Sequence, residues 1–186
     1  IALMRTIPGM VILNPSDDIE AKAAVKAAYE HEGPVYMRFG RLAVPIINDR
    51  PDYKFEIGKG VTLREGKDVA IIATGLCVSE SLAAAEKLAA DGIDAKVINI
   101  HTIKPLDEDL VVAAAKECGK VVTVEEHSVI GGLGSAVCET LSRKAPTPVK
   151  TIGVQDCFGE SGPAVALLEK YGLNAEGIYA SVKEFV

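Results

Sequence analysis

Two arginines near the N-terminal end of the chain lie where anion-binding side chains are often found. Arg38 is at the end of a predicted strand, Val35–Phe39, and Arg41 lies just beyond it. A guanidinium can hold a phosphate or a carboxylate through charge-assisted, bidentate hydrogen bonds, and ligands of open α/β sheets bind at the carboxyl ends of strands. Both arginines are therefore candidates for anion binding. The structural alternative is that both are solvated or pair with surface acids.

A second group of polar side chains follows the apolar segment Val121–Val124. Glu125, Glu126 and His127 come next, and the turn Gly131–Gly134 then opens a predicted helix. A histidine beside carboxylates can carry a proton, and the N–H groups of a glycine turn can bind an anion. The structural alternatives are that the histidine bonds an interface or a loop backbone, and that the glycines permit a tight turn. We favour these alternatives, because no nucleophile lies nearby and the glycine spacing fits no nucleotide-binding motif.

The remaining polar features are expected to be structural. His101 also ends a predicted strand, and His31 lies in the last turn of a predicted helix, where positive charge is favourable. The loop Asp156–Gly162 is expected to cap a helix that begins at Pro163. No group of His, Cys and Asp has metal-site spacing, and no G-x-S-x-G elbow is present. The chain therefore shows no self-sufficient active site.

The elements that would position these residues alternate between strands and helices. The predicted strands are Met10–Leu13, Val35–Phe39, Val69–Thr74, Ala95–Ile100, Val121–Val124 and Val149–Val154. The predicted helices are Glu20–Gly33, Val78–Asp91, Glu108–Cys118, Leu133–Lys144, Pro163–Tyr171 and Ala175–Phe185. This alternation indicates the α/β class, with a mostly parallel open sheet that carries helices on both faces.

The first β-α-β unit is separated from the others by a stretch without helical periodicity. Residues 42–65 include Pro45 and Pro51, and we interpret them as a linker that leads into an edge strand or hairpin around Phe55–Leu63. The predicted units are therefore residues 1–41, 42–65 and 66–186. Because the chain begins without methionine inside a folded-looking pattern, we expect it to be part of a longer protein.

Composition excludes several classes of protein. The net charge of −6, with scattered Lys and Arg, argues against a nucleic-acid-binding surface. No apolar stretch is long enough for a signal-peptide core or a membrane span. The four cysteines form no C-x-x-C pair and are expected to be free, buried thiols. We therefore expect a cytoplasmic protein that binds neither nucleic acid nor membrane.

Segments along almost the whole chain together resemble the thiamine-diphosphate-dependent transketolase family. They are MRTIPGMVILNPSDDIEA at 4–21, GPVYMRFGR at 33–41, VAIIATG at 69–75, INIHTIKPLDEDL at 98–110, VEEHSVIGGLGSAV at 124–137 and GVQDCFGESG at 153–162. EEHSVIGGLGSAV and FGESG are most similar to the short, split transketolases of bacteria and archaea, in which this region is a separate C-terminal subunit. Deoxyxylulose-phosphate synthase and the beta subunits of 2-oxoacid dehydrogenases share the layout and remain alternatives.

The resemblance implies that residues 1–41 are the C-terminal remnant of a pyrimidine-binding domain and residues 66–186 are the transketolase C-terminal domain. It implies transfer of a two-carbon ketol unit from a ketose phosphate to an aldose phosphate, in the non-oxidative pentose phosphate pathway. In the family, the glutamate that activates thiamine diphosphate, the substrate-binding histidines and the magnesium site precede the position of Ile1. We therefore expect no catalytic, cofactor-binding or metal-binding residue in this chain, and no activity from it alone.

The resemblance also assigns roles to the residues singled out above. Arg41 matches the arginine that contacts the sugar phosphate in family members, and Arg38 is the second candidate because two arginines fit that register. His127 and the turn Gly131–Gly134 match the signature loop of the C-terminal domain, a domain that in the family contributes mainly to dimer contact and subunit orientation. Glu125 and His127 are therefore candidates for interface or loop contacts. The implied partners are an N-terminal subunit or missing N-terminal part, a second copy in a dimer or other homo-oligomer, and phosphorylated sugars. A non-catalytic assembly module is the alternative from a different functional class.

Overall fold

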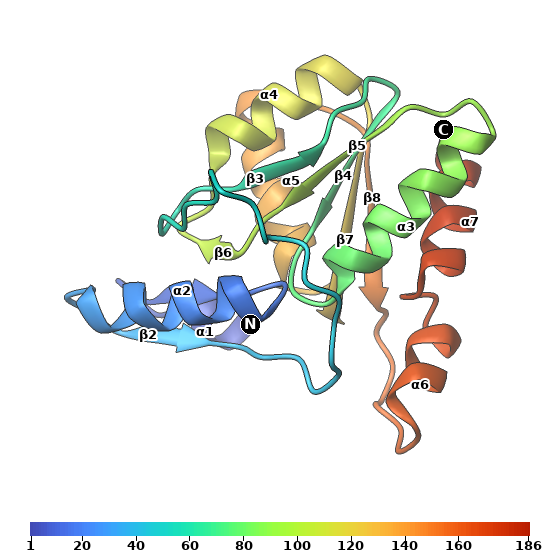
Figure 1. Cartoon of the computed structure of the whole chain (residues 1–186). Helices are drawn as coiled ribbons and strands as arrows, with labels where there is room; N and C mark the ends of the chain where they lie inside the picture. The colour runs from blue at the N-terminus through green and yellow to red at the C-terminus, as the bar shows by residue number, and fades with distance from the viewer.

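The computed structural model describes residues 1–186, and its largest feature is a five-stranded sheet in the order β3-β5-β4-β7-β8 (Figure 1). In that order the strands are Val61–Arg64, Ala95–Asn99, Val69–Ala73, Val121–Ser128 and Val149–Val154. Strands β5, β4, β7 and β8 run parallel, and β3 pairs antiparallel with β5 at one edge. The predicted α/β class and mostly parallel sheet are confirmed.

Helices cover both faces of this sheet (Figure 1). Helices α3, α6 and α7 pack on one face, and α4 and α5 pack on the other. Their bounds are Cys77–Ala90 for α3, Glu108–Cys118 for α4, Leu133–Lys144 for α5, Ala164–Lys170 for α6 and Ala175–Phe185 for α7. The prediction of helices on both faces is therefore also confirmed.

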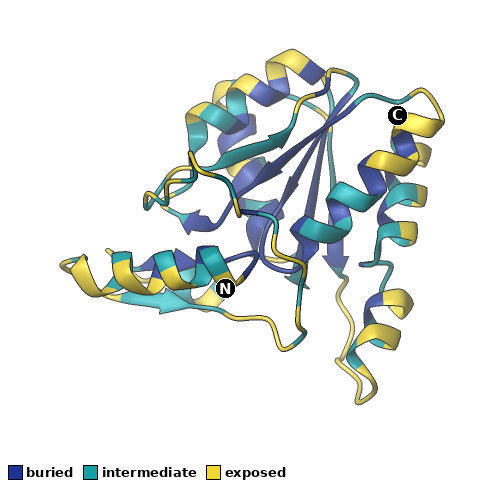
Figure 2. Cartoon of the chain, viewed as in Figure 1, coloured by how far each residue is buried: buried dark blue, intermediate teal, exposed yellow.

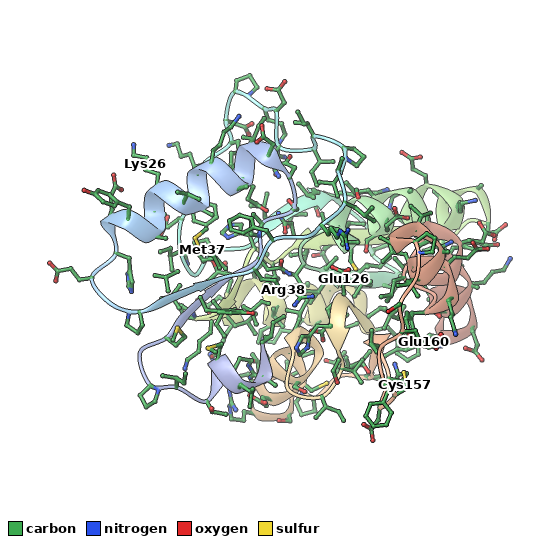
Figure 3. The ribbon with its side chains drawn as sticks, turned by 90° about the horizontal axis from the view of Figure 1, so that it is seen from below. Lys26, Met37, Arg38, Glu126, Cys157 and Glu160 are labelled. Atoms are coloured by element: carbon green, nitrogen blue, oxygen red, sulfur yellow. The ribbon has the colours of Figure 1, made fainter.

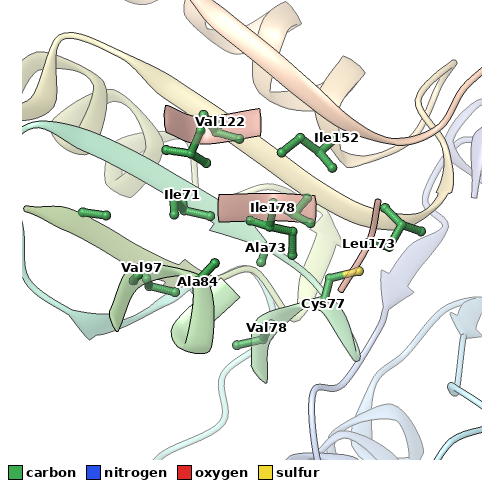
Figure 4. Packing of buried hydrophobic residues seen from close by; sticks show 14 of the residues in the cluster. Ile71, Ala73, Cys77, Val78, Ala84, Val97, Val122, Ile152, Leu173 and Ile178 are labelled. Atoms are coloured by element: carbon green, nitrogen blue, oxygen red, sulfur yellow. The ribbon is translucent and has the colours of Figure 1, made fainter. Parts of the chain in front are cut away.

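Strand β4 shows how one sequence segment supports two cores. Successive strand residues point to opposite faces, so Ile71 joins the core under α3 and α7 while Ile72 joins the core under α4 and α5. Figure 4 shows Ile71 and Ala73 among the side chains of the first core, with Ile178 of α7 nearby. Every β4 residue is fully buried, because both faces of the strand are covered (Figure 2).

A second, smaller sheet has the order β2-β1-β6. Strands β1, Val11–Leu13, and β2, Val35–Met37, run parallel and are joined by helix α2, Asp18–Glu30. This is the predicted β-α-β unit, and a short helix α1, Ala2–Arg5, precedes it. Strand β6, Thr102–Lys104, pairs antiparallel with β1 and is not among the predicted strands. At three residues it is too short for a sequence period, and its partner lies about 90 residues earlier in the chain.

Residues 42–65 are irregular until β3 begins at Val61, so the edge strand starts later than its predicted position around Phe55–Leu63. The irregular part is nevertheless fastened to α2. The Asp17 carboxylate caps α2 by accepting a hydrogen bond from the Glu20 N–H, and its Oδ2 also accepts from the N–H groups of Ile47 and Asn48, each at 2.8 Å. Burial favours the neutral form of Asp17, but these donors outweigh burial and lower its pKa.

Glu20 is the centre of a buried hydrogen-bond network that joins three parts of the chain. Its Oε2 accepts from the backbone N–H and the hydroxyl of Ser16, each at 2.7 Å. Its Oε1 accepts from the Tyr53 hydroxyl at 2.8 Å and from the Asn99 amide at 2.9 Å. The side chain is fully buried. Helix α2, the irregular connector and the last residue of β5 therefore share one carboxylate.

Two local expectations are corrected by the structure. Strand β7 continues past Val124 to Ser128. The loop Asp156–Gly162 does not cap α6, whose N-cap residue Pro163 has no side-chain cap. The loop is exposed throughout, and its Glu160 instead forms an ion pair with Lys170 at the far end of that helix.

All four cysteines are free, as predicted, but only Cys77 and Cys118 are buried; Cys138 is half-buried and Cys157 is exposed. None of the helices combines the length and the apolar character that crossing a membrane requires.

Candidate functional site

The two candidate arginines have different surroundings. Arg38 is the residue after β2, and its backbone N–H donates to the Leu13 carbonyl at 2.9 Å. Its guanidinium Nη2 donates to the backbone carbonyl of Glu126 at 2.6 Å and lies 3.9 Å from the Glu126 carboxylate. Figure 3 shows these two residues close together between the small sheet and the end of β7. Arg38 is therefore already engaged within the chain.

Arg41 is exposed, and its guanidinium forms no hydrogen bond or ion pair with the described residues 1–186. A surface pocket of about 350 Å³ lies between the start of α2 and the residues after β2. Gly40 and Leu42, the neighbours of Arg41 in the chain, both line this pocket. Other lining residues include Ser16, Asp17, Phe39 and Ile46. Arg41 itself is not a lining residue, so it offers an unused, exposed cation on the segment that borders this mixed polar and apolar pocket.

The pairing of β7 with β8 is interrupted by a bulge at the carboxyl end of β7, and the polar residues of β7 lie in this bulge. Val124 pairs with Ile152 and Ser128 pairs with Val154, so three β7 residues stand opposite the single residue Gly153. The carbonyl oxygens of these β7 residues lie close to Gly153, and a Cβ on Gly153 would lie 2.8 Å from one of them. Bulges of this kind redirect side chains and backbone groups at strand ends. Here the bulge frees the carbonyl that Arg38 contacts.

Glu125 fills the N-terminal end of helix α5. Its carboxylate oxygens accept hydrogen bonds from the N–H groups of Leu133 and Gly134, each at 2.8 Å. The side chain is buried, and burial raises its pKa against the opposing effect of these two donors. A helix N-terminus can bind an external anion, but the first N–H groups of α5 already have an acceptor from the same chain. The glycine turn and its acid therefore form a closed structural unit.

His127 contacts the local backbone. Its Nδ1 lies 2.7 Å from the Ser128 carbonyl oxygen, and its Nε2 lies 3.1 Å from the backbone nitrogen of Ile1. It is half-buried and 3.8 Å from the Glu125 carboxylate. Burial lowers the pKa of His127, against the hydrogen bond to Ser128. These contacts agree with the structural alternative, in which the histidine bonds the backbone of a loop. None of them involves a nucleophile.

The other residues singled out in the sequence are remote from ligand chemistry. His101 is buried and stacked on Phe55 with ring centroids 4.3 Å apart, and burial lowers its pKa. In the sequence, Asp17 and Glu20 have only the three-residue spacing of a capping-box-like helix start. Their contacts with the connector and with β5 went unrecognised, because nothing in the local pattern signals a partner 31 or 79 residues away.

Comparisons with known proteins match both parts of the chain to transketolase family models. A family model described as transketolase, C-terminal domain, matches residues 58–178, and one described as transketolase, pyrimidine binding domain, matches residues 1–46. The chain is 47% identical over 184 residues to 6-deoxy-6-sulfo-D-fructose transketolase subunit SqwH of Clostridium sp. (strain MSTE9), covering 99% of this chain and 57% of the relative. It is 40% identical over 191 residues to 1-deoxy-D-xylulose-5-phosphate synthase 1 of Geobacter sulfurreducens, covering 100% of this chain and 30% of that protein.

A solved structure shares both fold and sequence with this chain. It is described as "Split gene transketolase, inactive beta4 tetramer", with a TM-score of 0.93 and 52% identity, and the match covers 98% of this chain and 60% of that one. The chain thus spans a little more than half the length of its split-transketolase relatives.

Proposed function

The chain belongs to the transketolase family, and on this premise we propose that it is the C-terminal section of a split transketolase. Together with the parts that bind thiamine diphosphate, it transfers a two-carbon ketol unit from a ketose phosphate to an aldose phosphate. The observation that carries this proposal is that both family models, C-terminal and pyrimidine-binding, match one chain that is similar to a relative named as a transketolase subunit. We place the reaction in the non-oxidative pentose phosphate pathway and in the cytoplasm.

Arg41 is proposed to bind the terminal anion of the sugar substrate. Its guanidinium is exposed and unpaired, and its chain neighbours Gly40 and Leu42 line the pocket. It can therefore donate two parallel hydrogen bonds to a phosphate without first breaking contacts in the chain. The name of one relative describes a sugar that carries a sulfonate. A sulfonate presents a similar set of acceptor oxygens, so it is the second anion to test. Arg38, by contrast, already uses one of its guanidinium donors on the Glu126 carbonyl and is only partly exposed.

Thiamine diphosphate supplies the nucleophilic carbon that carries the two-carbon unit when it is bound. The chain's own residues offer no group of three or more His, Cys, Asp or Glu side chains placed to hold a metal ion. We therefore propose that the magnesium ion and the diphosphate are bound by the N-terminal partner or the missing N-terminal part. In this proposal the chain contributes Arg41, the pocket beside it and the surfaces on which the complete enzyme assembles.

The proposed partners are an N-terminal transketolase subunit and a second copy of the chain. The structural neighbour is described as an inactive tetramer of one subunit type. That description supports two expectations for this chain: self-association, in dimers or larger homo-oligomers, and inactivity in the absence of the other parts.

The proposal is tested by a coupled transketolase assay. Xylulose 5-phosphate, ribose 5-phosphate, thiamine diphosphate and magnesium would be supplied to the chain alone, and then to the chain extended by its pyrimidine-domain segment and mixed with the N-terminal subunit. We expect turnover only in the second mixture. Turnover by the chain alone would contradict the assignment of the cofactor site to other parts, and silence in both mixtures would contradict the transketolase assignment.

The competing function within the family is that of a deoxyxylulose-phosphate synthase, which the similarity to the Geobacter enzyme favours. The reconstituted enzyme would then consume pyruvate and release carbon dioxide, and it would show no ketol transfer between sugars. A beta subunit of a 2-oxoacid dehydrogenase would also consume a 2-oxoacid, but would pass on an acyl group. A purely structural assembly module would associate with its partner without changing the partner's turnover.

Replacing Arg41 with methionine in the reconstituted enzyme is expected to raise the KM for the ketose phosphate about 10- to 100-fold. This range corresponds to the loss of a hydrogen-bonded ion pair worth about 1.5–3 kcal/mol. Steady-state kinetics with the ketose phosphate and with the same ketose lacking phosphate would measure the effect. The unphosphorylated ketose is the control, because its KM should not change. Equal KM values for wild type and Arg41→Met with the phosphorylated sugar would remove Arg41 from the site.

A further inference from the structure

We infer that Arg38 is a positioning residue that fixes the segment carrying Arg41, and that it is not itself a substrate ligand. The segment in question, residues 38–48, is called the Arg41 segment below. The inference rests on the proposed function of Arg41 as the ligand of the sugar's anion. It assigns to the second candidate arginine a different task at the same site.

The first fixed point of the Arg41 segment is Arg38. Its backbone N–H continues the pairing of β2 with β1 through the Leu13 carbonyl, and its guanidinium binds the Glu126 carbonyl. That carbonyl lies in the β7 bulge, where the ladder with β8 is interrupted. A guanidinium is a charged donor, so this bond is stronger than a neutral one. Arg38 thus fastens the start of the segment to the end of β7, a partner 88 residues away in the chain.

The second fixed point is at the other end of the segment. The N–H groups of Ile47 and Asn48 both donate to the Asp17 carboxylate at the start of α2. Between the two fixed points, the side chains of Leu42 and Val44 pack against the core of the large sheet. Arg41 lies within this span, three residues after Arg38, and its side chain remains exposed. The backbone that carries it is therefore held while the guanidinium is left free.

Loss of the Arg38 contact would release only one of these restraints. The segment would keep its anchor at Asp17 and its packing, so the fold should persist, but the backbone three residues before Arg41 would be free to move. Small displacements of a positioned group are costly because binding and catalysis need precise orientation. The expected consequence is weaker binding of the phosphate by an Arg41 that is still present.

The test uses Arg38→Met in the reconstituted enzyme, with Arg64→Met as the matched control. Arg64 is a similarly half-buried arginine, 28% exposed against 30% for Arg38, and also donates to a backbone carbonyl, but it lies on the edge strand β3. We expect Arg38→Met to raise the KM for the ketose phosphate about tenfold, within the range of couplings between neighbouring residues. The kcat, the KM for the unphosphorylated ketose and all constants of Arg64→Met should change less than about twofold, as for a substitution remote from the site.

The double variant Arg38→Met/Arg41→Met separates positioning from a direct electrostatic effect. If Arg38 acts through Arg41, its replacement has no further effect once Arg41 is methionine, so the two changes are strongly non-additive. Additive effects would overturn the inference in favour of a second ligand, and an equal rise in KM for both ketoses would overturn it in favour of a general structural role. If Arg41→Met alone has no effect, the proposed function of Arg41 fails, which is a different result.

A conservative variant keeps the inference testable if Arg38→Met does not fold. Arg38→Lys retains a charged donor that can reach a carbonyl acceptor, and it is expected to keep the KM for the ketose phosphate within about threefold of wild type. A KM as high as that of Arg41→Met, in a folded Arg38→Lys enzyme, would show that a bound cation at this position does not position Arg41.

Discussion

Replacing Glu20 with leucine is expected to lower the free energy of unfolding by about 3–5 kcal/mol, because several buried donors lose a hydrogen-bond acceptor. The carboxylate accepts hydrogen bonds from Ser16, Tyr53 and Asn99 in a site closed to water. Without it the Ser16 and Tyr53 donors would lose their acceptor, and the Asn99 amide would keep only its contact with the Ser16 hydroxyl. Each unsatisfied buried donor costs about 1–3 kcal/mol. Burial of the leucine side chain would offset part of this cost, so the expected loss of stability is smaller than the sum over the donors.

Urea-induced unfolding of the wild-type chain and of Glu20→Leu would measure the difference. Glu30→Leu is the matched control, because Glu30 ends the same helix and is exposed. That control should change the free energy of unfolding by less than about 0.5 kcal/mol, as is usual for surface positions. Similar losses in both variants would show that the Glu20 network contributes little and that helix propensity or surface chemistry explains the change.

Replacing Gly132 with alanine is expected to destabilise the protein by about 3 kcal/mol or more, because it disrupts a buried, hydrogen-bonded carboxylate. A Cβ at this position would overlap the Glu125 Oε2, so the acid would have to move. Its oxygens accept from the first N–H groups of α5, and moving them leaves those groups without a partner. The glycine is thus required for the approach of a side chain, since its backbone angles are accessible to alanine.

Thermal or urea unfolding of Gly132→Ala would measure this effect, and Gly159→Ala is the control. Gly159 lies in the exposed loop before α6, and a Cβ there would meet no atom within 4 Å. Its replacement should leave stability almost unchanged. If Gly132→Ala were as stable as that control, the Glu125 carboxylate would have to rearrange without cost, which would contradict its assignment as the structural acceptor for α5.

Much of the fold was predictable because its signals are local. The apolar run Val69–Ala73 and the stripe of α3 each repeat with the period of one element, and the predicted bounds differ from the observed ones by a residue or so. The capping of α2 by Asp17 also depends on residues within one turn. Strand β6 escaped prediction because three residues are too few for a period and its pairing with β1 depends on how the two sheets meet.

The candidate site was only partly predictable, for the same physical reason. Residue type and strand-end position identified Arg38, Arg41, Glu125 and His127 as groups able to bind anions or carry protons. By these criteria alone Arg38 and Arg41 are equivalent, since both are arginines close to one strand end, and only the resemblance to transketolases ranks Arg41 first. The structure distinguishes them: one guanidinium has a carbonyl acceptor and the other is free.

The order and type of most elements follow from the sequence alone, and so do the α/β class and the resemblance to transketolases. The long-range contacts became visible only in the folded chain. Glu125 accepts hydrogen bonds from the first N–H groups of α5, and Glu20 joins α2 to Tyr53 and Asn99. Arg38 donates to a carbonyl in the β7 bulge. Helix and strand periods arise from residues within a few positions of one another. Which donor meets which acceptor across 79 or 88 residues is fixed only when the sheets and helices pack together.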